Sequence, residues 1–136
     1  MGEVNVGDKV MAASADGSMV SSRVYYIHDH KEEAQTVRVQ LSAGTLELTP
    51  AHMMPVYTEA CGTSYCSSAK NVAAKEIKAG SRVYVQGEEG SMVQTVMSVT
   101  KSSSMVRYVL TEAETVVVDG VVASVHSTAA GVLETM

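Results

Sequence analysis

Two side chains of the segment Thr49-Pro50-Ala51-His52 could act together on one peptide bond. The segment ends an apolar run, and its Thr-Pro pair predicts the start of a turn that Thr49 caps. A spacing of three places Thr49 and His52 on one face of that turn. There the hydroxyl can hydrogen-bond a peptide group and the imidazole can protonate its leaving nitrogen. Spacing alone favours a plainer interpretation, in which Thr49 only caps the turn and His52 only packs.

A second polar cluster, His28-Asp29-His30, stands where a β-branched and aromatic run ends in charged residues. An acid between two histidines can serve as a general base because its neighbours tune its pKa, so Asp29 is a candidate catalytic carboxylate. His28 and His30 could share one face of a strand and hold a metal, but the sequence offers no third ligand. We therefore expect no metal site, and without further evidence the cluster is typical of a solvated strand end.

Cys61 and Cys66 lie in a small, polar stretch that predicts a loop. A structural zinc site takes four ligands, and the four histidines supply no second pair at zinc-finger spacing. The two cysteines are compatible with a local disulfide in an oxidising compartment or with two free thiols. The localisation of the protein stays open at this point.

Several classes of function are excluded by composition. The net charge is −5, with lysines and arginines scattered along the chain, so the sequence has no electrostatic footprint for nucleic acid. No apolar run approaches the roughly 20 residues that span a bilayer, and we expect no membrane span. The sequence has no nucleophile elbow, no Gly-rich phosphate loop and no paired carboxylates, and we expect no cofactor.

The elements that must position these groups come from a repeat within the chain. Two glycine-led segments return 73 positions later, and a third segment returns with an offset of 70. The pairs are Gly7-Asp8-Lys9-Val10 with Gly80-Ser81-Arg82-Val83, Gly17-Ser18-Met19-Val20 with Gly90-Ser91-Met92-Val93, and Leu46-Glu47-Leu48-Thr49 with Val116-Val117-Val118-Asp119. A repeat of this length predicts two copies of one structural unit.

Each unit is predicted to be built of strands, because β-branched runs alternate with clusters of Gly, Asp and Ser. The 136 residues suit one domain, and the valine-rich composition without Phe or Trp favours strands. We therefore predict an all-β, pseudo-twofold body of duplicated β-hairpin units, with Gly44 and residues 112–114 at equivalent hairpin turns. Ala69–Ile77 is the best candidate for one short helix, and residues 60–75 are predicted to be a surface insertion. The predicted strands are Lys9–Ala13, Met19–Ile27, Thr36–Leu41, Thr45–Leu48, Arg82–Gln86, Ser91–Val99, Met105–Leu110 and Thr115–Val118.

Three ordered motifs resemble the Hint domain, and most closely the C-terminal autoprocessing domain of hedgehog proteins, which is related to inteins. Gly7-Asp8-Lys9-Val10 resembles the opening Gly-Asp-Arg-Val of that family, Thr49-Pro50-Ala51-His52 reproduces its Thr-x-x-His motif, and Val116–Ser124 is similar to its late strand. The resemblance covers nearly the whole chain and implies a single Hint domain over residues 1–136. The Hint fold is itself a pseudo-twofold duplication, which agrees with the repeat.

The resemblance also implies a chemistry of self-cleavage. In that family a cysteine at the start of the domain attacks the carbonyl before it and forms a thioester, and a second nucleophile then releases the upstream segment. His52 would protonate the nitrogen of the scissile peptide, Thr49 would hydrogen-bond the same peptide, and Asp29 falls where the family places a carboxylate that assists the nucleophile. The implied partners are the upstream segment of the same polypeptide and a small nucleophile as acyl acceptor.

The sequence departs from the family in ways that affect this expectation. The family cysteine precedes the Gly-Asp-x-Val motif by some twenty residues, whereas only Met1–Val6 precede it here, so we expect the first strand and its nucleophile to be missing. Cys61 and Cys66 follow the Thr-x-x-His motif and cannot replace that cysteine. Val125 stands where the family has a further cysteine, no Asn ends the chain, and nothing supports a sterol as acceptor.

Two hypotheses about function follow from these departures. In the favoured one, the chain is a piece of a self-processing domain that is inactive without its upstream cysteine. In the alternative, the scaffold is a non-catalytic β-rich binding module, because Gly7–Ile27 also resembles the first hairpin of an SH3-like or Tudor-like barrel.

Overall fold

The glycine-led repeats begin the same local structure in both halves of the chain. The computed structural model describes residues 4–29, 33–88, 90–105 and 107–125. Gly7 has a φ of 96° and Gly80 a φ of 97°, a left-handed conformation that glycine adopts without steric cost. The Gly7 N–H donates to the Val24 carbonyl at 2.7 Å, and the Gly80 N–H donates to the Val96 carbonyl at 3.0 Å. The repeat in the sequence is therefore a repeat in backbone geometry.

Twelve strands and one short 3₁₀ turn follow one another along the described residues. They are β1 (Lys9–Ala13), β2 (Met19–Asp29), β3 (Ala34–Gln40), β4 (Thr45–Leu48), β5 (Met53–Val56), β6 (Lys70–Ala73), η1 (Ala74–Glu76), β7 (Arg82–Gly87), β8 (Gly90–Thr95), β9 (Ser98–Ser104), β10 (Arg107–Thr111), β11 (Thr115–Val118) and β12 (Val121–Ser124). The prediction of an all-β body is confirmed. Among the described residues, no helix is long and apolar enough to cross a membrane.

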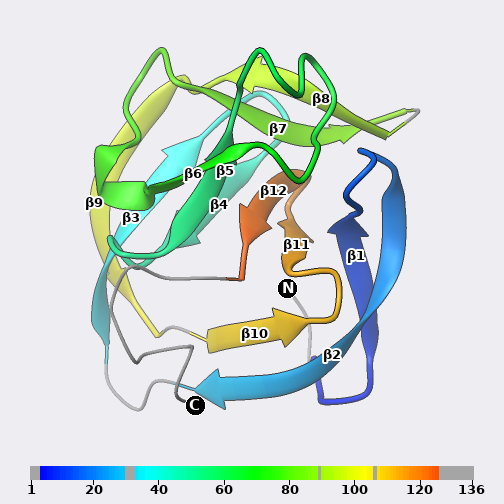
Figure 1. The fold of residues 1–136 in the computed structure, drawn as a ribbon. Coiled ribbons are helices and arrows are strands. Elements are labelled where there is room, and N and C mark those ends of the chain that lie inside the picture. The colour runs from blue at the N-terminus through cyan, green and yellow to red at the C-terminus, as the bar shows by residue number, and fades with distance from the viewer. Residues whose placement is uncertain (1–3, 30–32, 89, 106, 126–136) are drawn as a thin grey trace.

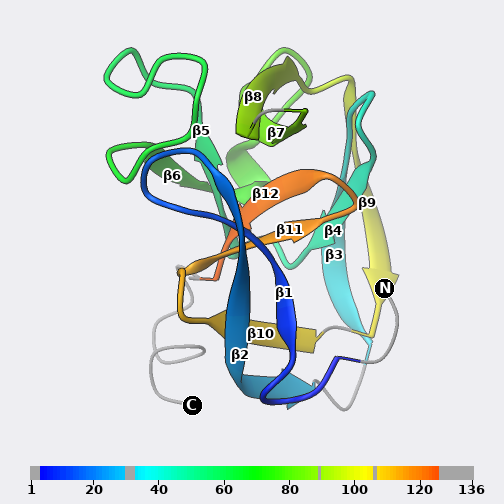
Figure 2. The ribbon, with the colours of Figure 1, turned by 90° about the vertical axis from the view of Figure 1, so that its right-hand side faces the viewer.

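The strands form three sheets, and each sheet combines strands from both halves of the chain (Figure 1). In the first sheet, β10 from the second half pairs with β2 from the first half. In the second, β9 from the second half pairs with β3 from the first half, with β4 at the edge. The largest sheet has the order β11-β12-β7-β5-β6, and β8 also pairs with β7. Both views place β11 and β12 in the middle of the molecule (Figures 1 and 2).

The main core fills the space between these sheets with aliphatic side chains. Val39, Val83, Val85 and Val121 are fully buried there, and Met54 of β5 packs among them. Valine is β-branched and fits a pleated surface, so the composition that predicted strands also supplies the core. Leu48 precedes the Thr49–His52 segment and Met54 follows it, and both side chains are buried in this core. The segment is thus held in place at both ends.

Three local predictions differ from the structure. The helix predicted at Ala69–Ile77 is wrong, because Lys70–Ala73 form β6 and only Ala74–Glu76 make a single 3₁₀ turn. The strand predicted at Ser91–Val99 is broken between β8 and β9. The turn at residues 112–114 is present, with the Glu114 N–H on the Thr111 carbonyl, but it joins two sheets instead of closing a hairpin. The Gly44 turn does close the β3–β4 hairpin.

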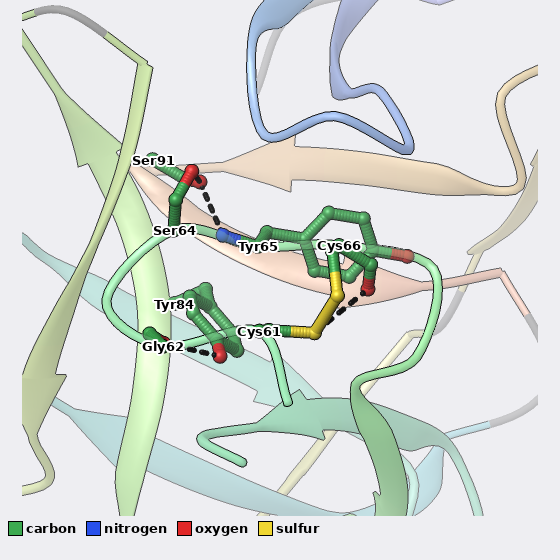
Figure 3. Close-up of a disulfide and its surroundings, with 7 residues drawn as sticks. All are labelled: Cys61, Gly62, Ser64, Tyr65, Cys66, Tyr84 and Ser91. Carbon is green, nitrogen blue, oxygen red and sulfur yellow. Dashed lines mark hydrogen bonds between the residues drawn. A yellow bond between two sulfur atoms is a disulfide. The ribbon is translucent and has the colours of Figure 1, made fainter. Parts of the chain in front are cut away.

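Cys61 and Cys66 form a disulfide in the loop that joins β5 to β6 (Figure 3). The loop lies on the β7–β8 hairpin through its backbone. The buried Tyr84 hydroxyl donates to the Gly62 carbonyl at 2.9 Å, and the Tyr65 N–H donates to Ser91 Oγ at 2.7 Å. The Tyr65 and Tyr84 rings meet edge to face at 5.8 Å. The disulfide therefore closes a short loop whose surroundings are already ordered by β7 and β8.

Replacing both cysteines, Cys61→Ser with Cys66→Ser, should lower the free energy of unfolding by about 2 kcal/mol, because the crosslink restricts a short loop in the unfolded chain. Urea unfolding followed by circular dichroism measures the change. Ser67→Ala, an exposed change in the same loop, is the control and should leave the midpoint where it is. An unchanged midpoint for the double variant would contradict the stabilising role of the disulfide.

Candidate functional site

The Thr49-Pro50-Ala51-His52 segment forms the predicted turn between β4 and β5. The His52 N–H donates to the Thr49 carbonyl at 3.1 Å and closes it. From outside, the Ala74 N–H donates to the His52 carbonyl at 2.8 Å and the Lys75 N–H donates to the Pro50 carbonyl at 2.9 Å. The 3₁₀ turn η1 therefore fixes the backbone on which both candidate side chains stand.

The Thr49 hydroxyl does not cap this turn. Thr49 is only 9% exposed, and its Oγ1 has no hydrogen-bond partner within the part of the chain that the structure describes. Burying a hydroxyl without a partner costs roughly 1–3 kcal/mol of stability. The interpretation of Thr49 as a simple cap of the turn therefore does not agree with the structure.

His52 is anchored to the opposite half of the molecule. Its Nε2 lies 2.5 Å from the carbonyl oxygen of Ser124, which ends β12 and is buried. A carbonyl oxygen can only accept, so Nε2 carries the hydrogen and the ring is held in one tautomer and orientation. The same carbonyl would stabilise an imidazolium through a charge-assisted bond.

Thr49 and His52 line one pocket of about 420 Å³. Its walls come from four regions of the fold, namely β3, β4 with the turn that follows it, the end of β9 with β10, and the β11–β12 hairpin. Most of the lining is apolar, with polar groups gathered near β4. The lining residues are Thr36, Thr45, Leu46, Glu47, Leu48, Thr49, His52, Ser104, Met105, Val109, Val116, Val118 and Ala123.

Glu47 is a polar residue of this pocket that the sequence analysis did not single out. Its carboxylate accepts hydrogen bonds from the Thr36 hydroxyl and, at 2.6 Å, from the Ser104 hydroxyl, and Arg38 lies at 3.4 Å. The Ser104 hydroxyl, followed by the Thr36 hydroxyl, holds the pKa of Glu47 below its usual value. The sequence does contain an indication of this position. Side chains two residues apart on a strand lie on the same face, and Glu47 precedes Thr49 by two residues.

The third predicted catalytic residue, Asp29, ends β2, where its backbone is opposite Arg107 in β10. Its side chain lies outside the part of the chain that the structure describes, as does His30. The catalytic role of Asp29 therefore stays a prediction. Among the described residues, no three His, Cys, Asp or Glu side chains lie close enough together to hold a metal ion.

Ser104→Ala should raise the pKa of Glu47 toward its usual value, since it removes the largest stabilising contact of the carboxylate. A lowered folded-state pKa gives stability that is present above the unfolded pKa and is lost as the pH falls through the folded value. The free energy of unfolding of the wild type should therefore exceed that of the variant by the largest amount near neutral pH. This difference should become smaller as the pH falls. A carbon-13 NMR titration of the carboxyl checks the pKa, and identical titration curves would contradict the assigned contact.

Comparisons with known proteins agree with this geometry. An intein from a hyperthermophile superposes with a TM-score of 0.71 at 18% identity, over 85% of this chain and 70% of that one. The DnaX mini-intein of Spirulina platensis gives 0.69 at 12% identity, over 90% of this chain and 85% of its own. A DnaB intein from Synechocystis gives 0.68 at 11%, over 85% and 77%. These likenesses show the fold, and the Hint module profile matches residues 1–132, so the chain belongs to the Hint family and shares its all-β fold with inteins.

Proposed function

We propose that this Hint domain is a self-processing domain that converts a peptide bond held in the 420 Å³ pocket into a thioester. The observation that carries the proposal is the pairing of two unlike groups at one pocket. The Thr49 hydroxyl is buried there without a partner among the described residues, and the His52 ring is fixed there by the Ser124 carbonyl. A hydroxyl that can hydrogen-bond a peptide group, beside an imidazole of fixed orientation, is suited to acyl transfer.

The proposed step balances as an N-to-S acyl shift. The sulfur of an upstream cysteine bonds to the carbonyl carbon before it, and the C–N bond of that peptide breaks. The thiol proton passes to the neutral His52 imidazole, and the imidazolium so formed donates it to the amide nitrogen, which leaves as a free amine. Thr49 orients the same peptide by a hydrogen bond. The Ser124 carbonyl accepts a hydrogen bond from the His52 ring and so stabilises the imidazolium while the ring carries the proton.

An extended segment would fit the pocket as an added strand. β4 pairs only with β3 in its sheet, so within the described residues its other edge has no pairing strand, although the Thr45 N–H there already donates to the Asp119 carboxylate. β11 pairs only with β12 in its sheet, and β1 meets it at Ala13, whose N–H and carbonyl both bond the Thr115 hydroxyl. Both strands line the pocket, through Thr45 and Glu47 on one side and Val116 and Val118 on the other. Unpaired strand edges are templates for a further strand. We propose that the cysteine-bearing strand lies there.

The domain organisation follows from this arrangement as part of the same proposal. Residues 1–136 are one Hint domain, residues 60–75 are an insertion into its scaffold, and the nucleophile is supplied from upstream, so that residues 1–136 alone do not cleave. The order of the Gly7-Asp8-Lys9-Val10 and Thr49-Pro50-Ala51-His52 motifs and of the Val116–Ser124 segment supports the hedgehog type within the family. Release would then need a small external nucleophile as acyl acceptor.

A reporter protein joined to residue 4 through a cysteine-led strand of a hedgehog-type domain should be released by hydroxylamine or by a thiol. His52→Ala should slow release by about a hundredfold or more, because it removes the proton donor. Thr49→Val should slow it by about tenfold, because one hydrogen bond to the reacting peptide is lost. Gel electrophoresis with mass spectrometry of the released reporter measures the rates.

Thr58→Val is the matched control for Thr49→Val. Thr58 Oγ1 is the other buried side-chain oxygen without a partner among the described residues, and Thr58 is not part of the pocket lining. It should leave the release rate close to that of the parent. If the full-length reporter persists in every fusion protein, including the parent, self-processing is refuted and a non-catalytic binding module is the better description.

Asp29→Ala should leave thiol-driven release nearly unchanged and slow transfer to a weaker nucleophile such as an alcohol by about tenfold. The reason is that a carboxylate that assists the second nucleophile matters most when that nucleophile is not already reactive. Parallel release assays with dithiothreitol and with glycerol measure the two rates. Equal loss in both assays would show that Asp29 has another role.

A further inference from the structure

The pocket carries a fixed negative charge on one wall. Of the residues that line it, Glu47 and His52 have ionisable side chains, and the rest are apolar or neutral polar. The Glu47 side chain is 25% exposed, so its charge is partly shielded from water. Three strands hold the carboxylate in place, because Thr36 belongs to β3, Glu47 to β4 and Ser104 to β9. Such a carboxylate keeps its position when a ligand enters.

The contacts of Glu47 suit an electrostatic role better than proton transfer. Its pKa is lowered, which makes it a weak base near neutral pH. A carboxylate has roughly four acceptor positions, and Thr36, Ser104 and Arg38 take three of them. Arg38 offsets the charge only in part, since its side chain is 51% exposed and water screens it. The remaining acceptor position of Glu47, together with the part of its charge that Arg38 does not offset, therefore acts on whatever enters the pocket.

Glu47 also lies near the reacting groups. It precedes Thr49 by two residues, which on a strand is roughly 7 Å along the chain. Two unit charges at about that separation still interact appreciably where the surroundings are partly shielded from water. Glu47 therefore interacts electrostatically with any charge on an acyl acceptor that approaches a peptide group beside Thr49.

We propose that Glu47 is a specificity-determining residue that selects positively charged acyl acceptors over negatively charged ones. The inference rests on the proposed function, since it concerns the second step of that reaction. In that step the acceptor heteroatom bonds to the thioester carbonyl, the bond from carbonyl carbon to domain sulfur breaks, and the proton of the acceptor ends on that sulfur. Glu47 takes no part in these bonds and acts only on the charge that the acceptor carries elsewhere.

Three thiols of different charge test the proposal in the reporter fusion protein described above. They are cysteamine, which is a cation, 2-mercaptoethanol, which is neutral, and 3-mercaptopropionate, which is an anion. Glu47→Gln should lower the ratio of the cysteamine rate to the mercaptopropionate rate by about tenfold relative to the parent. The rate with 2-mercaptoethanol should change much less. Arg38→Gln, which removes the cation beside Glu47, should raise the same ratio.

Ratios separate this role from a merely structural one. Intrinsic thiol reactivity cancels when variants are compared, and so does any fraction of misfolded protein. Glu76→Gln is the charge-matched control, because Glu76 is exposed on η1 outside the pocket and should not alter the ratio. An unchanged ratio in Glu47→Gln, with all three thiols still releasing the reporter, would overturn the role of Glu47 alone. No release from the parent with any thiol would overturn self-processing itself, and the proposal with it.

Discussion

Strands from the two halves of this chain pair with each other in every sheet. β10 pairs with β2 along its length, and β3 pairs with β9 from Ala34 opposite Ser104 to Gln40 opposite Ser98. Removing either half would leave a long strand with unpaired backbone groups, which is costly when the strand faces a core. The two units therefore stabilise each other through backbone pairing, and the Ser91 N–H on the Gly17 carbonyl at 2.9 Å joins their hairpin tips as well.

The pocket depends on the same pairing between the halves, because two of the contacts that hold its polar side chains cross from one half to the other. His52 follows β4 in the first half and is oriented by Ser124 at the end of β12 in the second. Glu47 lies on β4 and is held by Ser104, which β9 brings from the second half. Either half alone would lack the contact that orients the imidazole and one of the two hydroxyl contacts of the carboxylate. The geometry that we propose for acyl transfer is thus a product of the tertiary pairing and is lost if the halves separate.

The sequence predicted the parts of this structure that local rules control. The glycines at 7 and 80 fixed matching turns, and β-branched runs located most strands because valine suits a pleated surface. Non-local effects were not predictable in the same way. β5 contains Pro55 and Lys70–Ala73 has helix-forming residues at both ends, yet both segments become strands because they pair within a large sheet. For the same reason the sequence left the disulfide undecided and did not predict the Glu47 contacts, because the fold alone brings the partners of these groups together.

The two halves differ at the turn that follows β4 in one copy and β11 in the other. Position 50 corresponds to position 120 in the repeat. Asp119 and Gly120 have φ values of 51° and 81°, which suit a two-residue hairpin turn, and β11 and β12 pair on either side of it. Pro50 cannot adopt a positive φ, so the same tight hairpin is forbidden between β4 and β5. β5 instead joins the large sheet beside β7, β4 keeps one edge without a pairing strand, and Thr49 and His52 of the turn between them line the pocket. Proline thus occupies the position where the other copy of this duplicated scaffold has glycine, and the turn that it imposes brings Thr49 and His52 to a pocket that both copies line.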